Sequence, residues 1–523
     1  MRPSFWQPPV DPSVAEQAII KRIRRAKLFV FLRHHRHELF DETFQGELAT
    51  LYQDSPLGQP PIAPAQLALA TILQAYMGIS DDEVIEATTM DRRWQLVLNC
   101  LDCSEPPFSK GTLVGFRQRL IEAQMDRRLI EQTIAVAAAT AAFGARPLRA
   151  ALDSSPLWGA SRVEDTYNLL GHALRKALGV IARQQGRGLA EVAVEAGATL
   201  LSGSSLKAAL DLDWDDPQER EGALALVLKT LSAVEAWLDT HPEGSEAKAV
   251  QESVATAQQV KQQDVQINEN GKPVLRKGVA KDRRISVEDA QMRHGRKSRS
   301  VRVDGYKRHI LRDLDTGLVR AVGLTAANAA EATVTEAIRA DLTCQQIELK
   351  ELHIDRAYLS SSWVRERSAD LTVYCKAWPV RNGTRFLKTA FELDWERLLI
   401  RCPNHVELPF EPGGMVQFPA QTCAACPLRE RCTTSVRGRS VSIHPDEALL
   451  SELRQRQLTT VGKAKLRERV AVEHALAHIG RWQGRRARYR GLRKNLFDLR
   501  RTAVVHNLHV IARLPERPQT EVA

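Results

Sequence analysis

Apolar side chains recur at helical spacing through the first ~145 residues, which predicts an all-helical N-terminal part. One such stripe consists of Leu69, Ile72, Leu73 and Tyr76. Gly78 is expected to end this helix, and Ser80 with Glu83 predicts a capping box at the start of the next one. Another helix is expected at Thr112–Glu122. Short helices joined by tight turns suit a helix-turn-helix-like DNA-binding unit, and equally a plain helical bundle.

The pattern changes at Pro147, where a short apolar run predicts a strand over Leu148–Leu152. This strand would deliver Asp153 at its C-terminal end, because the turn-prone Ser154-Ser155-Pro156 follows directly. Helical spacing then returns, with one amphipathic stripe made of Leu224, Val227, Leu228, Leu231, Val234 and Leu238. We therefore expect a helical insertion over residues 163–280.

Further strands are predicted beyond residue 300. Tyr306–Leu311 and Leu318–Leu324 flank Asp315-Thr316-Gly317, a sequence typical of a hairpin connection. Leu349–Asp355 is a third strand that again ends in an aspartate. The remaining elements are expected to be helices at 326–342 and 360–369 and a strand at 371–374. Strands that alternate with helices indicate an α/β core.

A last helix is predicted over Arg467–Ile479, which contains no helix-breaking residue. Arg469 and Glu473 stand four residues apart and so share one face of it.

Composition places the chain among globular proteins. It has 523 residues, of which 43% are hydrophobic and 26% are charged, and this length predicts several structural units. No apolar stretch is long enough to span a membrane, and the N-terminus lacks the layout of a signal peptide. We therefore expect a cytoplasmic protein without membrane contact, in which the eight cysteines are thiols or metal ligands rather than disulfides.

The net charge of +11 is concentrated in two segments. One runs from Lys281 to Arg312, and a denser one from Lys463 to Arg501. Clustered Arg and Lys at this density favour contact with a nucleic-acid backbone, the alternative being a solubilising surface.

Three carboxylates form a candidate catalytic set. Asp153 and Asp355 stand where predicted strands end, a common place for ligand-facing groups, and Glu473 lies on the last predicted helix. Such oxygen ligands suit a pair of Mg²⁺ ions, which can activate an attacking hydroxyl and stabilise a leaving oxygen. Spacing alone is weak support, because the chain has 63 acidic residues.

The order of several short motifs resembles the DDE transposases of bacterial insertion sequences. They are Leu152-Asp153-Ser154-Ser155, Asp304-Gly305-Tyr306-Lys307, Thr325-Ala326-Ala327-Asn328-Ala329-Ala330-Glu331, Ile354-Asp355-Arg356-Ala357-Tyr358, Arg469 to Glu473, Arg488-Tyr489-Arg490-Gly491 and Asn507. The resemblance implies an RNase H-like mixed-sheet core preceded by an all-helical N-terminal domain. It also implies that Asp153, Asp355 and Glu473 bind two Mg²⁺ (or Mn²⁺) ions.

The chain departs from part of that family around Glu473. Many relatives have a Tyr three residues before the Arg and a Lys seven residues after the Glu, where this chain has Leu466 and Gly480. Arg481 and Arg485 are the nearby cations that could make the missing phosphate contact. The full set that we expect to bind DNA is Arg469, Arg481, Arg485, Arg486, Arg488, Arg490, Arg493, Lys494, Arg296, Lys297 and Lys307.

Four cysteines form a candidate zinc site. Cys402, Cys423, Cys426 and Cys432 have the spacing C-x20-C-x2-C-x5-C in a stretch rich in Pro and Gly. Such a stretch has little core of its own, and a tetrahedral structural Zn²⁺ would supply the missing folding energy. Ordinary reduced thiols are the alternative. Some members of the resembling family carry a similar cysteine-bearing insertion before the glutamate helix.

These inferences predict a magnesium-dependent transposase that cuts the ends of an insertion sequence and joins their 3′-hydroxyls to target DNA. The domains are expected at 1–145 (DNA binding) and 146–515 (RNase H-like), the latter interrupted by 163–280 and by a zinc-binding insertion at 400–435. The partner is double-stranded DNA, with a homodimer in the DNA complex and a nucleoid-associated location. The alternatives are a nuclease without strand transfer and a non-catalytic zinc-containing DNA-binding protein.

Overall fold

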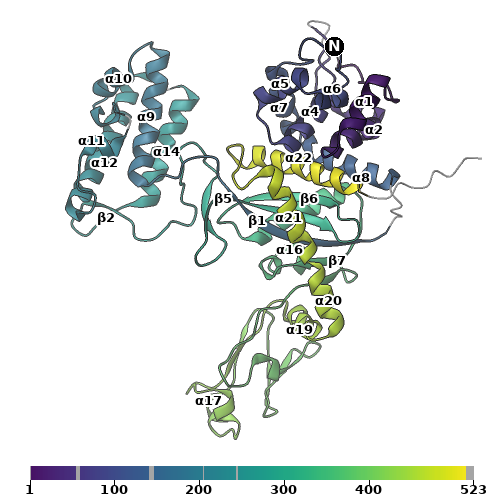
Figure 1. Ribbon diagram of the computed structural model, residues 1–523. Coiled ribbons are helices and arrows are strands. Elements are labelled where there is room, and N and C mark those ends of the chain that lie inside the picture. Colours follow the sequence, from purple (N-terminus) through teal and green to yellow (C-terminus); the bar gives the residue numbers. More distant parts are fainter. Residues whose placement is uncertain (1, 55–58, 141–145, 204, 243–245, 514–523) are drawn as a thin grey trace, which may run out of the picture.

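A curled, mixed β-sheet forms the centre of the computed structural model, which describes residues 2–54, 59–140, 146–203, 205–242 and 246–513 (Figure 1). β5 and β1 are antiparallel neighbours, β7 runs parallel to β1, and β8 runs parallel to β7. β4 and β6 both pair with the other edge of β5, antiparallel to it. In this part of the chain the sheet consists of β1 (Leu148–Trp158), β4 (Arg293–Arg296), β5 (Arg302–Asp313), β6 (Val319–Ala326), β7 (Leu349–Ile354) and β8 (Thr372–Tyr374).

β1 is longer than its apolar run predicts. The expectation that it ends at Asp153 is wrong, because its antiparallel pairing with β5 continues to Trp158, opposite Gly305. The parallel pairing with β7 stops earlier, at Leu152. Pro156 is tolerated within the strand because β1 has no partner on the β7 side there, so a missing backbone N–H costs no ladder hydrogen bond.

The other strand predictions are confirmed in position. β5 and β6 form the expected hairpin, and Gly317 in its connection has a φ of 82°, which glycine adopts without strain. β7 ends at Ile354, directly before Asp355. The helices around them are shorter than predicted: η3 (Glu331–Val334) and α15 (Thr335–Cys344) replace the helix expected from 326, and α16 is Ser362–Arg365.

The N-terminal part is helical, as the periodicity predicts. Gly78 caps α4 with a φ of 70°, and Ser80 and Glu83 make the predicted reciprocal capping box. The elements are α1 (Val14–Arg22), α2 (Lys27–Leu39), α3 (Glu42–Ala49), α4 (Pro64–Met77), α5 (Asp81–Met90), α6 (Arg92–Leu98), α7 (Lys110–Glu122), η1 (Met125–Arg127) and α8 (Arg128–Thr140). The domain boundary expected at residue 145 lies outside the described residues.

The N-terminal helices share one hydrophobic core with the sheet. Buried side chains of α4 such as Leu69 belong to the same cluster as Val322 of β6 and Val472 of α21 (Val470–Gln483). The long C-terminal helix α22 (Leu492–Ile511) lies between the two parts and contacts α4, α8 and β6 (Figure 1). The helices therefore form a continuous body with the sheet.

The block between β1 and β4 packs around a core of its own and lies to one side of the sheet (Figure 1). Its predicted stripe is confirmed on α12, where Leu224, Val227, Leu231, Val234 and Leu238 are buried. The block contains α9 (Thr166–Gln184), α10 (Leu189–Glu195), η2 (Thr199–Leu201), α11 (Leu206–Leu210), α12 (Pro217–Thr240) and α14 (Lys248–Asp264), followed by the hairpin β2 (Val265–Ile267) and β3 (Pro273–Leu275).

A third unit projects below the sheet, away from the N-terminal helices, and carries the four clustered cysteines (Figure 1). A small separate core, which includes Phe391, Ile400 and Phe418, holds it together. The unit consists of η5 (Lys388–Ala390), β9 (Glu392–Asp394), β10 (Leu399–Arg401), β11 (Glu407–Pro409), β12 (Met415–Gln417), α17 (Ala420–Ala424), α18 (Arg429–Cys432) and β13 (Ser440–Ser442). α19 (Glu447–Arg456) and α20 (Thr460–Glu468) then return the chain to the sheet.

Within the described residues, no helix is both long and apolar enough to cross a membrane.

Candidate functional site

The strand register brings two of the predicted carboxylates to one edge of the sheet. Leu152 of β1 pairs with Ile354 of β7 in the parallel register, and Asp153 and Asp355 are the next residue on each chain segment. Asp355 caps the short helix η4 (Arg356–Tyr358) by accepting a hydrogen bond from the backbone N–H of Arg356. Both aspartates line a cleft of about 740 Å³.

Glu473 reaches the same cleft from the first turn of α21. The unbroken helix expected over Arg467–Ile479 is not present, because α20 ends at Glu468 and α21 begins at Val470. The interruption is one residue long: Arg469 keeps right-handed helical angles (φ −57°, ψ −28°), and its carbonyl accepts from the N–H of Val472. The chain thereby changes from one helix to the next at the residue that faces the two carboxylates.

Arg469 bridges two of the three carboxylates. Its guanidinium donates to Asp153 and, from Nη2, to Glu473 at 2.8 Å, which is the predicted i,i+4 pair. Burial raises the pKa of Asp153, the Arg469 charge opposes this, and the charges of Glu473 and Asp355 add to it. The three carboxylates repel one another, so the space between them favours a positive charge. Arg469 supplies that charge in this structure.

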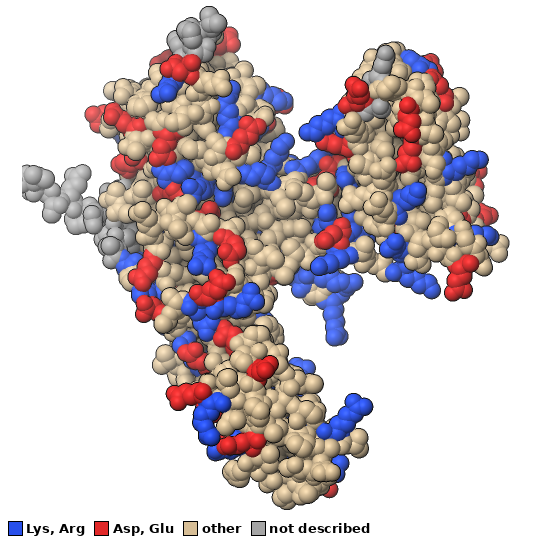
Figure 2. All heavy atoms as spheres, turned by 180° about the vertical axis from the view of Figure 1, so that it is seen from behind, with Lys and Arg blue, Asp and Glu red and all other residues tan. Residues whose placement is uncertain are grey.

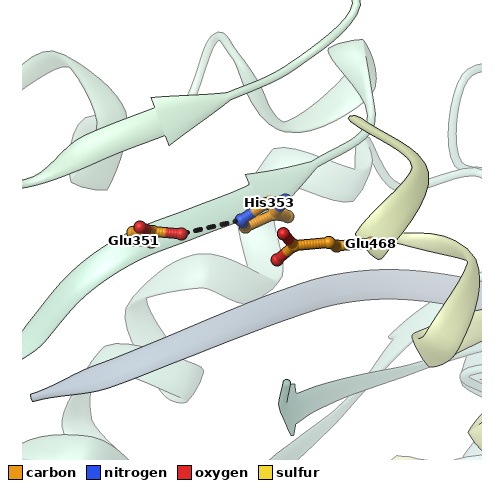
Figure 3. Close-up of side chains that lie close together, drawn as sticks. All are labelled: Glu351, His353 and Glu468. Atoms are coloured by element: carbon orange, nitrogen blue, oxygen red, sulfur yellow. Dashed lines mark hydrogen bonds and ion pairs between the residues drawn. The ribbon is translucent and has the colours of Figure 1, made fainter. Parts of the chain in front are cut away.

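A second group of potential metal ligands lies behind this site. In the part of the chain that the structure describes, one group of His, Cys, Asp and Glu side chains has all its ligand atoms within 4.8 Å of one another: Glu351, His353 and Glu468. Figure 3 shows Glu351 and His353 side by side on β7, with Glu468 facing them from the end of α20. Arg149 and Lys465 form ion pairs with both glutamates, so the negative charge of this group is already balanced.

This network fixes the position of Arg469. It joins β1, β7 and α20 and includes the residue directly before Arg469. Burial raises the pKa of Glu351, but hydrogen bonds from Arg149 and Lys465 outweigh it and lower that pKa to about 2. Glu351 is therefore a carboxylate anion at every physiological pH, and the ion pairs persist.

Part of the predicted DNA-binding set lines the cleft. These residues are Arg469, Arg481, Arg485, Arg296, Lys297 and Lys307. The backbone of Arg485 is held in place because its carbonyl accepts from the N–H of Trp158 at the end of β1. Seen from behind, Lys and Arg side chains gather where the helical block meets the body of the molecule (Figure 2).

The rest of that set lies away from the cleft lining, and several members make internal contacts. Arg486 donates to the carbonyl of Gly159, and Arg488 donates to the carbonyl of Ile79 in the N-terminal part. Arg490 pairs with Glu288. Arg493 pairs with Asp126, whose side chain is fully buried, whereas Lys494 is exposed.

Two cleft residues were missed as site candidates in the sequence. Glu331 follows β6 and pairs with Lys307 across 3.8 Å. Arg308 lies on β5 opposite Ser155 and is 6% exposed. Glu331 belongs to one of the family-like motifs, and that motif could have identified it as a site residue. Arg308 stands in a basic segment among many similar residues, so only the register of β1 and β5 distinguishes it.

The four clustered cysteines line one small cavity of about 30 Å³ in the projecting unit. They are half-buried, and burial raises the pKa of the Cys432 thiol, with the other three cysteines adding to the effect. Four thiols around one cavity are a donor set that fits a zinc ion. Unlike the ligand atoms of Glu351, His353 and Glu468, the four sulfur atoms do not all lie within 4.8 Å of one another.

Two stretches of the chain match known protein families. Residues 410–512, which include Arg469, Glu473 and the basic segment, match the family described as "Transposase DDE domain". Residues 21–119, which cover α2–α6 and most of α7, match the family described as "Transposase domain (DUF772)". Both matches are to transposase families, and together they support a DDE transposase of insertion-sequence type.

Comparison with curated proteins and with solved structures gives no match for this chain. The matched DDE domain family implies the use of divalent metal ions, and transposases act on DNA. Asp153 and Asp355 lie outside both matched stretches, so their place in the site rests on the β1–β7 register and on the cleft that they share with Glu473.

Proposed function

We propose that this transposase cuts the ends of an insertion sequence and joins the freed 3′-hydroxyls to target DNA. The observation that carries the proposal is the cleft in which Asp153, Asp355 and Glu473 lie beside a wall of basic side chains. Carboxylates suit hard divalent cations, and the cations of the wall suit the phosphates of a DNA strand.

The sheet supports an RNase H-like assignment for the catalytic core. Its order, β6-β5-β1-β7-β8 with β1 central, combines an antiparallel half with a parallel half. We infer from it that residues 146–515 form the catalytic domain, interrupted by the helical block and by the cysteine-bearing unit. The N-terminal helices would contribute DNA contacts, and a homodimer would hold the two element ends together.

Asp153, Asp355 and Glu473 would hold two Mg²⁺ or Mn²⁺ ions, a fit that the mutual repulsion of these carboxylates around Asp153 supports. When bound, the ions activate an attacking hydroxyl and stabilise the leaving oxygen of the phosphodiester. The chain itself orients the strand: Arg469, Arg481 and Arg485 would hold phosphate oxygens at the cleft. Release of Arg469 from Asp153 and Glu473 would free its guanidinium for that contact.

The cysteine-bearing unit would hold a structural zinc ion through Cys402, Cys423, Cys426 and Cys432. The common cavity of the four side chains and the small size of the surrounding core support this assignment.

The test of the catalytic carboxylates is cleavage of DNA that carries the element ends, which are expected as inverted repeats flanking the gene. Asp355→Asn and Glu473→Gln should each reduce cleavage at least about 100-fold while retaining DNA binding. Asp370→Asn is the control, since Asp370 is exposed and outside the cleft lining. Unchanged cleavage in both variants would exclude this set. Joining of a pre-cut end by the wild-type protein distinguishes a transposase from a nuclease.

A further inference from the structure

Arg308 is a buried arginine in the wall of the cleft that contains the three carboxylates. Its Nε donates to Ser155 Oγ at 2.7 Å, and its Nη1 donates to Gln483 Oε1 and to the carbonyl of Gly484, both at 3.0 Å. These contacts fix the guanidinium between β1 and the C-terminal end of α21. All three acceptors are uncharged, so they satisfy N–H groups without neutralising the charge.

The charge of Arg308 has no carboxylate in direct contact with it among the described residues, and Asp498 acts on it only at longer range. Among the residues that the structure describes, no carboxylate forms an ion pair with it within 4.0 Å, in contrast to Arg469, which has two such partners. Burial lowers the pKa of Arg308 to about 10, so the side chain is still a cation at neutral pH. A buried cation without a contacting counterion is unfavourable, and such a site gains from an anion that enters with the ligand.

The Nη2 nitrogen of this guanidinium has space beside it. A Cβ atom on Gly480 would lie 3.2 Å from Nη2 of Arg308, and Gly480 itself lines the cleft. Nη2 makes no hydrogen bond to any described residue. A side chain at position 480 would crowd Nη2, whereas glycine leaves this nitrogen accessible.

Gln483 adds a second donor without an acceptor. Its side chain is 8% exposed, and its amide nitrogen Nε2 is buried without a hydrogen-bond partner. The bond from Arg308 to Oε1 fixes which end of the amide is the nitrogen. Buried donors are normally satisfied, so this unpaired amide next to Arg308 is a feature that a ligand acceptor would complete.

We propose that Arg308, supported by Gln483, binds a non-bridging phosphate oxygen of the DNA strand that enters the cleft. The proposal rests on the proposed function, because it takes the ligand of the cleft to be DNA. A polyanion fits better than a small anion, since Arg296, Lys297, Arg481 and Arg485 extend the positive wall beyond Arg308.

The decisive variant is Gln483→Glu, which changes an amide oxygen already bonded to Arg308 into a carboxylate oxygen. It gives Arg308 an internal counterion without removing the guanidinium, and we expect it to fold with an unchanged or higher melting temperature. Gln455→Glu, at an exposed position of α19, makes the same change in net charge away from the cleft and is the matched control. Arg308→Met is the complementary variant.

The measurement is binding of a labelled 30-base-pair duplex in EDTA, by fluorescence anisotropy, across a range of KCl concentrations. Gln483→Glu should weaken binding about tenfold at low salt and reduce the slope of log K against log[KCl] by about one phosphate contact. Arg308→Met should do the same if it folds, and Gln455→Glu should match wild type. Equal slopes for Gln483→Glu, Gln455→Glu and wild type would overturn the proposal.

This readout needs no metal and no cleavage, so the two hypotheses fail separately. If Asp355→Asn still cleaves DNA while Gln483→Glu flattens the salt dependence, the carboxylate assignment is wrong and the phosphate site stands. If Asp355→Asn abolishes cleavage while Gln483→Glu binds as the control does, the phosphate site is wrong and the proposed function stands.

Discussion

Asp153 and Asp355 occupy equivalent positions on two adjacent parallel segments, each one residue past the last β1–β7 pair, Leu152 with Ile354. Yet one lies within a strand that continues to Trp158, and the other lies at the start of a 3₁₀ helix. The end of parallel pairing, rather than the end of a strand, places the two carboxylates at one edge. The cleft opens there because, from Asp153 to Leu157, β1 has a strand partner on the β5 side only.

Arg469 is expected to compete with divalent cations for Asp153 and Glu473, because it pairs with both of them. Arg469→Met should therefore raise the affinity for Mn²⁺, by about tenfold, since a neighbouring positive charge has been removed. The same variant should lose cleavage, because the phosphate contact is lost. Mn²⁺ binding without DNA can be followed by electron paramagnetic resonance. Lys465→Met removes a nearby cation that pairs with Glu351 instead and should leave Mn²⁺ affinity unchanged; weaker Mn²⁺ binding by Arg469→Met would contradict the competition.

Arg493 and Lys494 are adjacent in the basic segment but are expected to behave differently. Arg493 pairs with Asp126, whose side chain is fully buried, so Arg493→Gln leaves a buried carboxylate short of one partner. Losing the Arg493–Asp126 ion pair should lower the free energy of unfolding by about 2–4 kcal/mol. The cost is limited because Arg500 still contacts Asp126. Lys494→Gln should leave stability unchanged and weaken DNA binding. Thermal unfolding and duplex binding of both variants check this; a stable Arg493→Gln protein with weakened DNA binding would reverse the assignment.

The cysteine-bearing unit should contain about one zinc ion per chain, since four thiolates saturate one tetrahedral ion. Cys423→Ser/Cys426→Ser should lose this metal and become sensitive to proteolysis within residues 386–443, because the core there is small. Elemental analysis of the purified protein gives the metal content. Cys344→Ser, at an exposed cysteine outside the unit, should retain it. A wild-type protein that lacks zinc after purification without chelators would leave the four residues as ordinary thiols.

Three histidines at the contact between helices α21 and α22 are expected to make the protein sensitive to acid. Burial lowers the pKa of His506 and of His509 to about 4, and it also lowers that of His478, whose Nδ1 lies 3.0 Å from Nδ1 of His506. The folded state keeps these rings neutral, whereas the unfolded chain binds protons below its ordinary pKa of about 6.5. Stability is therefore full above that pH and is lost as the pH falls from about 6.5 towards 4.

His506 alone should account for about 2 kcal/mol between pH 7 and pH 5, from the size of its pKa shift. Chemical denaturation of wild type and His506→Gln at the two pH values measures this contribution. The variant should be less stable at pH 7, because the ring is buried, but should lose less stability on acidification. An identical loss in both proteins would show that His506 stays protonated or exposed.

Local sequence signals predicted most elements where the pattern was periodic. The capping box of Ser80 and Glu83, the stripe on α12 and the hairpin around Gly317 all depend on neighbours in the chain, and all three are confirmed. Elements decided by distant partners were predicted less well. The end of β1 depends on β5, which lies some 150 residues further along, and the break at Arg469 places a side chain against β1.

The basic residues show the same limit. A charge run in the sequence cannot distinguish Arg485, which lines the cleft, from Arg488, which donates to the carbonyl of Ile79. Likewise, nothing local separates Arg308 from its neighbours, since its burial and its uncharged contacts arise from packing between β1 and α21.

Residue type and short spacing were enough to predict the helical and strand periodicities, the family-like motifs and the candidate carboxylates and thiols. Which of these residues meet depends on the tertiary structure. The β1–β7 register sets Asp153 beside Asp355, the turn at Arg469 brings Glu473 to them, and the shared core joins the N-terminal helices to the sheet. Such contacts depend on the closure of long loops and on the packing of distant surfaces, which no short stretch of sequence encodes.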